Sequence, residues 1–515
     1  MIKTRLTTLD DVSGDARLPG YQPQAHGIGI VHLGVGAFHR AHQAVITDDA
    51  LAKHGGDWRI AGVCLRSKDS AKNLNEQNGL YTLIERDQSA TTARVIASID
   101  HVIAADPKAT LALLSDAAIR IVTLTVTEAG YGINRENRLP DKSNLVVARD
   151  LTDPENPTGV LGLLVASIAR RREAGCVPFT VLSCDNLSGN GALLRDGVIG
   201  FARATFGAEL AQWIKNNIAF PNSMVDRITP ASTDDTRIVA AQQTGCDDLA
   251  AVEAEPFIQW VIEDNFNSGR PQWEHGGAIF VSDVSPYEQM KLTMLNGAHS
   301  MLAYSGFLTA CKHVRDVMHD EALSILVNRH INAAASVLKP LPGVDLNEYG
   351  LALADRFANP AIAHDTYQIA ADGTQKLPQR IFEPALAAID AQLDTRPYAF
   401  ATAMWMRFCL QHHDEGARYE LHDPRAAEIT IAISGAGQDA SDLSHRFHAL
   451  PDLIPARLAD NQQWRTNIDK VLGTILNSGC RAAITREVDM IAVDMIEVDK
   501  INESNEIQTD LRIFV

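Results

Sequence analysis

Lys291, Asn296 and His299 lie close together in the segment KLTMLNGAHS, and their side chains can carry out acid–base chemistry. In an α-helix, where each residue turns by about 100°, the three side chains fall within an arc of about 140° on one face. A lysine facing a partly apolar site has a lowered pKa, which suits a general base that takes the proton of an alcohol. Asn296 can donate to the oxygen that develops charge, and His299 can orient substrate hydroxyls. The competing interpretation is a solvated helix face.

A glycine-containing turn near the N-terminus is the second chemical feature. Residues 27–33 are predicted to form a strand, Gly34-Val35-Gly36 a tight turn, and residues 41–51 a helix. Glycines there let the backbone approach a pyrophosphate, which the amide groups at the helix start bind. His39 replaces the third glycine of the G-x-G-x-x-G pattern, which predicts looser helix packing or a local adaptation. The predicted dinucleotide-binding residues of the turn are Gly34, Gly36, Ala37 and Phe38, with a simple tight turn as the alternative.

The end of the next predicted strand, residues 58–65, bears on the choice between NAD and NADP. An acidic residue at this place binds the adenosine ribose hydroxyls, and Asp69 can take that part. Arg66 and Lys68 can instead neutralise a 2′-phosphate. We expect NAD, while these residues leave NADP open and also fit a loop of solvated charges.

A parallel sheet with helical crossovers is needed to hold this turn. Further apolar runs at 119–126, 177–183 and, more weakly, 278–284 alternate with helical or mixed segments. From about residue 287 the strand signals fade and long helical patterns dominate, for example at 290–308. The last stretch, from about residue 486, is acidic and alternates like a strand, but its place in the fold stays open. The sequence therefore predicts an α/β fold: a Rossmann-type dinucleotide-binding domain at residues 1–285 and a mainly α-helical domain at 286–515 that carries Lys291. Two other predicted helices cover 320–338 and 384–393.

Composition limits the classes of partner. The 515 residues hold 46 basic and 64 acidic side chains, a net charge of −18, which disfavours nucleic acid and anionic membrane surfaces. No stretch approaches a membrane span or a cleavable signal, so a cytoplasmic location is expected. The seven cysteines are scattered without a C-x-x-C pair, which predicts reduced thiols and neither a disulfide framework nor a zinc site. His32, His39 and His42 are spaced for phosphate or helix contacts rather than for a metal.

The spacing K-x4-N-x2-H is similar to that of the polyol-specific long-chain dehydrogenases, the mannitol dehydrogenase family, and the chain resembles that family over nearly its whole length. The matching segments are IVHLGVGAFHRAHQA, VTLTVTEAGY, FTVLSCDNLSGNG, FPNSMVDRITP, EPFIQWVIEDNF with GRPQWE, and PYEQMKLTMLNGAHS. The resemblance implies a nicotinamide-dependent oxidoreductase acting on a small sugar-derived alcohol. It also implies that no metal is required, because a lysine and two amides replace zinc, and that the protein can be a monomer.

The resemblance assigns roles residue by residue. It implies that Lys291 is the base and that Asn296 and Asn186 hold the reacting oxygen; a turn asparagine is the alternative for Asn186. Asp226 would bind substrate and tune the charge near the lysine, or else form a salt bridge with Arg227 or another base.

Three further residues receive roles in the same way. Glu288 resembles the position that relays protons to water, and a solvated glutamate at a helix start is the alternative. Thr127 and Glu128 follow the third strand and would lie near the nicotinamide ribose, with a strand-end cap equally compatible.

The segment DGTQKLPQR bears on the substrate. Lys376 and Arg380 can hold a sugar carboxylate, and the segment resembles the fructuronate reductase members more than the mannitol dehydrogenases, which often carry arginine where Gln368 stands here. We therefore expect interconversion of D-mannonate and D-fructuronate. Mannitol, arabinitol or another polyol is the alternative, in which Lys376 binds a shared hydroxyl and Arg380 is a surface residue. A non-catalytic dinucleotide sensor is a remote alternative, because it would have lost the lysine and its amides.

Overall fold

A computed structural model describes residues 4–65, 68–87, 90–360, 364–437 and 439–492. The chain divides into two compact units, Met1–Glu288 and Gln289–Val515. The division falls within helix α11 (Ser285–Met290), which also contains the boundary expected at residues 285 and 286. We describe each unit by itself.

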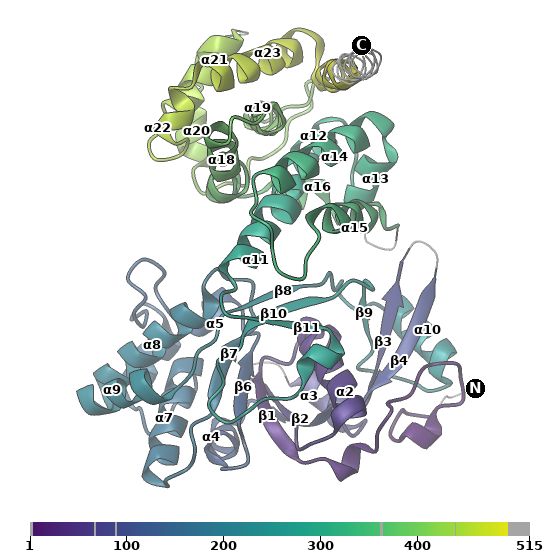
Figure 1. The fold of residues 1–515 in the computed structure, drawn as a ribbon, viewed down its shortest axis with the longest axis vertical. Helices are drawn as coiled ribbons and strands as arrows, with labels where there is room; N and C mark the ends of the chain where they lie inside the picture. The colour runs from purple at the N-terminus through teal and green to yellow at the C-terminus, as the bar shows by residue number, and fades with distance from the viewer. Residues whose placement is uncertain (1–3, 66–67, 88–89, 361–363, 438, 493–515) are drawn as a thin grey trace, which may run out of the picture. The chain divides into compact units, whose positions relative to one another are not determined.

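The N-terminal unit is built on a parallel sheet of five strands in the order β5-β2-β1-β6-β7 (Figure 1). This is the Rossmann order, so the direction of winding reverses between β1 and β6, where such sheets bind their ligands. The predicted α/β fold class is confirmed. The strands are β1 (Ile28–Leu33), β2 (Arg59–Cys64), β5 (Ile99–Ala104), β6 (Ile121–Leu124) and β7 (Thr180–Ser183).

Alternate residues of β1 pack into different cores, as expected for a strand buried on both faces. Val31 and Leu33 join a core formed with the helices of one face, whereas Ile30 packs on the other face with α2. The helices of the first face are α4 (Pro107–Ser115), α7 (Val160–Glu173), α8 (Asn190–Thr205) and α9 (Ala208–Asn217). Helices α1 (Ala37–Ala41), α2 (Gln43–His54) and α3 (Asp69–Asn75) follow β1 and β2.

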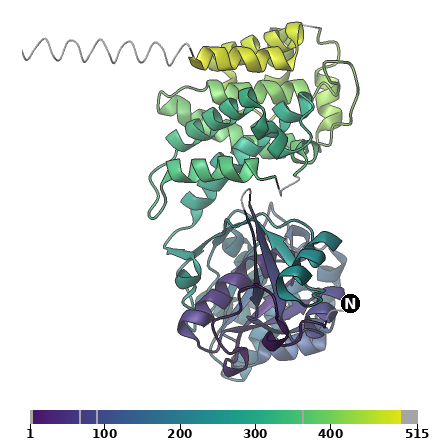
Figure 2. The same ribbon diagram turned by 90° about the vertical axis from the view of Figure 1, so that its right-hand side faces the viewer.

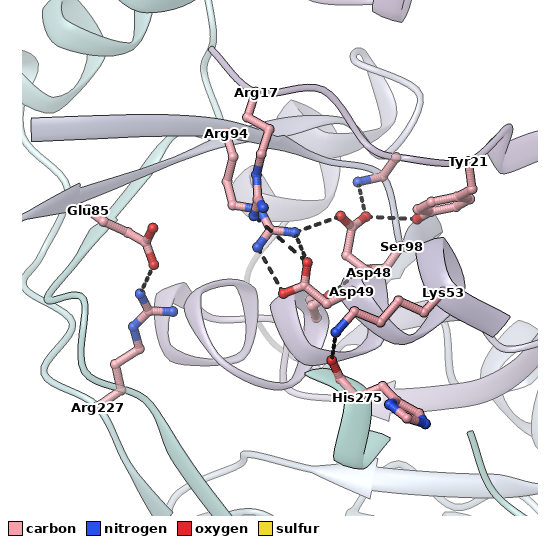
Figure 3. A network of polar contacts seen from close by, with 12 residues as sticks. Arg17, Tyr21, Asp48, Asp49, Lys53, Glu85, Arg94, Ser98, Arg227 and His275 are labelled. Carbon is pink, nitrogen blue, oxygen red and sulfur yellow. Dashed lines mark hydrogen bonds and ion pairs between the residues drawn. The ribbon is translucent and has the colours of Figure 1, made fainter. Parts of the chain in front are cut away.

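Two smaller sheets complete the unit, in the orders β4-β3-β9 and β11-β10-β8. Arg94 on β4 is hydrogen-bonded to the carboxylates of Asp48 and Asp49 on α2, and the hydroxyl of Tyr21 donates to Asp48 over 2.7 Å (Figure 3). The buried charges are thus paired, which fixes α2 against the small sheet. The strands are β3 (Tyr81–Arg86), β4 (Thr91–Ile96), β8 (Ser223–Asp226), β9 (Val252–Ala254), β10 (Gln259–Glu263) and β11 (Ala278–Val281).

The described residues of the C-terminal unit form helices and connecting loops (Figure 2). The predicted helices appear as α12 (Gly297–Leu308), α14 (Glu321–Ser336) and α18 (Glu383–Asp390), and α15 (Leu346–Ala358), α16 (Thr366–Ala370) and α17 (Gly373–Leu377) lie between them in the chain. In the part of the chain that the structure describes, no helix is long and apolar enough to cross a membrane.

The strand-like reading of the last stretch is wrong for its described part. Residues 480–492 are helical, and the buried positions Ala483, Ile484 and Glu487 follow helical spacing. The carboxylate of Glu487 accepts hydrogen bonds of 2.8 and 2.7 Å from Arg396, which anchors this helix. The alternation of acidic and apolar residues in the sequence is compatible with both a strand and a helix. In the folded chain, packing of the buried residues stabilises the helix.

Candidate functional site

The two glycines of the turn after β1 have different surroundings. Gly34 has a φ of 102°, and a Cβ added there would lie 2.2 Å from the carbonyl oxygen of Thr125, so only glycine fits. Gly36 precedes α1, and its added Cβ would meet nothing nearer than the Gly34 carbonyl oxygen at 3.9 Å. The space beside Gly36 is therefore open to a ligand, as a phosphate-binding turn requires.

His39, in place of the third glycine, is completely buried and stacks on His32 of β1, with ring centroids 3.4 Å apart and an interplanar angle of 12°. The His32 ring also lies within hydrogen-bonding distance of the Thr123 and Thr125 hydroxyls, at 2.8 and 2.9 Å. Burial lowers the pKa of His32 to about 3, so the ring is neutral. Of the two expectations for His39, looser helix packing or a local adaptation, the stacked pair of rings is a local adaptation.

A cavity of about 490 Å³ opens at the carboxyl ends of β1, β2 and β6, a volume typical of small-molecule sites. Gly34, Gly36 and Thr127 contribute to its lining, together with Cys64, Leu65 and Ser70 at the end of β2 and the start of α3. It therefore lies at the reversal point of the sheet, where a dinucleotide is held in this fold. The residues present fit that group.

The other residues expected at the cofactor are placed as follows. Ala37 begins α1, and Phe38 stacks on His42 with ring centroids 5.0 Å apart. Asp69 begins α3 with an exposed side chain, next to the cavity residue Ser70. Arg66 and the side chain of Glu128 lie outside what the structure describes.

The loop that follows β7 carries Asn186 at an exposed position. Glu288 contacts this loop: its carboxylate accepts a hydrogen bond of 2.8 Å from the Ser188 hydroxyl and weaker ones from the Gly189 amide. The expectation for Glu288 was proton relay or a solvated glutamate. The contacts show that this side chain also binds the loop that bears Asn186.

Asp226 is the last residue of β8 and is buried. The neighbouring Arg227 donates to the Glu85 carboxylate (Figure 3) and to the carbonyl oxygens of Ala41 and Glu255. Arg227 thus has the Glu85 carboxylate as an ionic partner.

Lys291 and Asn296 begin and end a π-helical turn, η4 (Lys291–Asn296), which precedes α12. Hydrogen bonds in a π-helix join residues five apart, so these two side chains lie closer together around the axis than the α-helical estimate of 140°. Lys291 is buried, with 8% of its surface exposed, as is His299 with 9%. The expected single α-helix across this segment is wrong; π turns of this kind occur frequently at functional sites.

His299 faces a second histidine that the sequence analysis missed. Its ring centroid lies 4.6 Å from that of Phe357 and 5.5 Å from that of His364. Burial and the charge of Lys376 lower the pKa of His364, against the opposing effect of Asp365. No spacing pattern connected residue 364 with residue 299, because they lie on separate elements.

Arg380 lies on a second π turn, η5 (Pro378–Phe382), which packs against η4. Its guanidinium donates to the Ser300 hydroxyl at 3.3 Å, and Ser300 in turn donates to the Asn296 carbonyl oxygen at 3.1 Å. Burial lowers the pKa of Arg380. Lys376 donates to the carbonyl oxygens of Ile369 and Ala371, at 3.2 and 2.6 Å. Burial, followed by the charge of Arg380, lowers the pKa of Lys376.

Within the described residues, no three histidine, cysteine, aspartate or glutamate side chains gather as a metal site would require. His32 and His39 stack on each other, and His42 lies 2.9 Å from the carbonyl oxygen of Gln259.

Comparison with protein families covers most of the chain. Residues 28–275 match the mannitol dehydrogenase Rossmann domain, and residues 283–463 match the mannitol dehydrogenase C-terminal domain. The D-mannonate oxidoreductase of Escherichia coli (strain K12) is 39% identical over 431 residues, which are 82% of this chain and 88% of that protein.

Two solved structures share the fold over both units. The mannitol 2-dehydrogenase of Pseudomonas fluorescens, in a ternary complex with NAD and D-mannitol, is 35% identical, with a TM-score of 0.77 over 95% of this chain and 100% of that chain. A substrate-free D-sorbitol dehydrogenase is 36% identical, with a TM-score of 0.87 over 94% of this chain and 100% of that chain.

Proposed function

The chain belongs to the mannitol dehydrogenase family of oxidoreductases, and on that premise we propose that it oxidises D-mannonate to D-fructuronate with NAD. The relatives that support this reaction are D-mannonate oxidoreductase and an NAD-containing mannitol 2-dehydrogenase. The open space beside Gly36, at the carboxyl edge of the sheet, supports a bound dinucleotide.

The observation that best supports a sugar-acid substrate is the charge around Arg380. Among the described residues, no acidic side chain forms an ion pair with its largely buried guanidinium, and its charge lowers the pKa of Lys376. A buried charge without a counterion is costly, and a carboxylate is the ligand that a guanidinium binds best. A sugar acid supplies that carboxylate, whereas a neutral polyol does not.

The proposed reaction removes a hydride and a proton from one secondary alcohol. Lys291, in its neutral form, accepts the hydroxyl proton, and the amides of Asn186 and Asn296 donate to the oxygen as it becomes a carbonyl. NAD, when bound, supplies the hydride acceptor. Asp226 contributes negative charge near the base and binds substrate, His299 orients substrate hydroxyls, and Glu288 passes the proton from Lys291 to water.

Oxidation of a neutral polyol such as mannitol is the second candidate, and Lys376 favours it. The ammonium group of Lys376 already donates to two carbonyl oxygens and lies 3.9 Å from the Asp372 carboxylate. Its charge is partly compensated, so a substrate hydroxyl would satisfy it.

Turnover of D-mannonate and D-mannitol by wild type and Arg380→Gln separates the two candidates. A charge-assisted hydrogen bond contributes about 1.5–3 kcal/mol, so we expect kcat/KM for mannonate to fall about 10- to 100-fold in the variant. Mannitol oxidation changes little.

Arg457→Gln is the matched control, because Arg457 is an exposed arginine of the same unit, paired with Asp390. Lys291→Ala is expected to abolish turnover of both compounds. A preference of the wild type for mannitol that Arg380→Gln leaves intact would rule out the aldonate assignment.

A further inference from the structure

Asp185, the residue before Asn186, lies at the centre of a hydrogen-bond cluster at the cavity edge. One carboxylate oxygen accepts from the Val126 amide at 2.9 Å and from the Tyr131 hydroxyl at 2.7 Å. The other accepts from the Thr127 amide at 3.2 Å. The same Tyr131 hydroxyl lies 2.6 Å from that of Ser183. Asp185 therefore connects the ends of β6 and β7 through its own side chain.

The backbone at Thr127 requires such a connection. Thr127 has a φ of 65° and a ψ of 162°, a conformation that a β-branched residue adopts at a cost in free energy. A strained conformation persists only where its surroundings impose it, and Asp185 binds the amides of Thr127 and of the residue before it. Thr127 also lines the cavity. The strain thus lies where the cofactor would be held.

The main chain of Asp185 is fixed as well. Its carbonyl oxygen accepts from the Asn190 side chain at 3.1 Å, and the same Asn190 amide group donates to the Ser223 carbonyl oxygen at 2.8 Å. Glu288 binds the loop at Ser188 and Gly189. Asn186 is therefore carried by a loop that is held at both ends, with Asp185 as its inward-facing end.

We propose that Asp185 is a positioning residue for hydride transfer: its carboxylate fixes Thr127 at the cofactor cavity and Asn186 at the reacting oxygen as one rigid edge. This inference rests on the proposed function, because it assumes that Asn186 holds that oxygen. Burial raises the pKa of Asp185, while the hydrogen bonds from Tyr131 and from the Val126 and Thr127 amides oppose this rise. All three groups donate, so an acceptor on both oxygens is required.

Asp185→Asn keeps the shape and places an NH2 group against one of these donors, which makes it the informative substitution. We would measure kcat with saturating NAD for Asp185→Asn, Asn186→Ala and the double variant, on the polyol or aldonate that the wild type oxidises fastest. Displacing a reacting group by about 1 Å costs on the order of 100-fold, so kcat falls by about that factor in Asp185→Asn. In the Asn186→Ala background the same change lowers kcat less than about 3-fold. Equal losses in both backgrounds would overturn the proposal.

NADH affinity, measured by fluorescence titration without any sugar, tests the cofactor side separately. We expect Asp185→Asn to weaken it about 10-fold, since Thr127 is released, and an unchanged affinity would overturn the proposal. This arm holds even if mannonate is not the substrate, so failure of the substrate assignment and failure of the Asp185 assignment give different results.

Asp248→Asn is the matched control, because Asp248 is a buried carboxylate that also accepts from backbone amides, at Thr82 and Ala250. We expect it to lower the thermal midpoint and to leave kcat and NADH affinity within about 2-fold of wild type. A loss of kcat in this variant as large as in Asp185→Asn would show that general destabilisation explains both, and would also overturn the proposal.

Discussion

Gly34 and Gly36 stand two residues apart and serve different purposes. Gly34 is fixed by the protein, because its positive φ and the nearby Thr125 carbonyl oxygen exclude any side chain. At Gly36 an added Cβ would lie 3.9 Å from its nearest neighbour, the Gly34 carbonyl oxygen, so no described atom excludes a side chain there. Its purpose is therefore found in a ligand, and the two positions can be separated by experiment.

Alanine at each position should have opposite consequences. Gly34→Ala lowers the free energy of unfolding by about 2 kcal/mol or more, because it combines strain with a clash. Gly36→Ala leaves that free energy within about 0.5 kcal/mol of wild type and weakens NADH binding 10-fold or more, because the new methyl group occupies the place of the pyrophosphate. Urea unfolding and NADH titration measure the two effects. Normal NADH binding by Gly36→Ala would argue against a pyrophosphate at this turn.

At the scale of elements, the strands that could be predicted are those with apolar runs in the sequence. Strands β1, β2, β6 and β7 are nearly continuous apolar runs and were found from the sequence, whereas β3 ends in Glu85 and Arg86, β4 contains Arg94, and both were missed. The π turn at Lys291–Asn296 was not predictable, because its apolar residues fit an α-helix as well. Asp185 precedes the predicted residue Asn186 in the sequence. Its contacts with Val126 and Tyr131 could not be predicted, because only the fold brings these residues together. Lys291 and Asn296 were predicted to be catalytic residues from the chemistry of their side chains, and this stays a prediction.

The packing of the two π turns can be tested at Gly297. A Cβ there would lie 2.9 Å from the Arg380 carbonyl oxygen and 3.2 Å from the His330 ring. Overpacking costs about 1–3 kcal/mol and pushes η5 away from η4, so Gly297→Ala should lower the thermal midpoint and reduce kcat/KM for the aldonate about 10-fold.

Gly350→Ala is the comparison, since its Cβ would meet only side-chain carbons, with Ile331 nearest at 3.0 Å. Side chains can shift more readily than a backbone carbonyl, so this variant is expected to keep its activity. Equal activity in the two variants would mean that the spacing of the π turns does not matter for catalysis.

At the scale of the whole molecule, buried neutral histidines couple stability to pH. Burial lowers the pKa of His32 to about 3 and that of His330 to about 4, and it holds the pKa of His39 well below its usual value. Below pH 6.5 the unfolded chain binds protons that the folded chain does not. The stabilisation is therefore complete above pH 6.5 and is lost as the pH falls toward these lower values.

Each such histidine makes the free energy of unfolding fall by about 1.4 kcal/mol for each pH unit below 6.5. His39→Phe keeps the stacked ring and removes one titrating group, so its stability should fall less steeply between pH 6.5 and 5 than that of wild type, by about this amount per unit. Urea unfolding across that range measures the slopes. His445→Phe, at an exposed position, is the control for the exchange of histidine for phenylalanine itself. Parallel slopes for wild type and His39→Phe would show that His39 is protonated in the folded protein.

The stack of His32 on His39 also links two positions that a glycine fingerprint treats as independent. In a relative with glycine at the position of His39, the residue at the position of His32 has no ring to stack on. We therefore expect the two positions to change together during divergence. A pattern that demands three glycines would overlook this chain. A pattern that accepts either a third glycine or a matched pair of rings, seven residues apart, would find it.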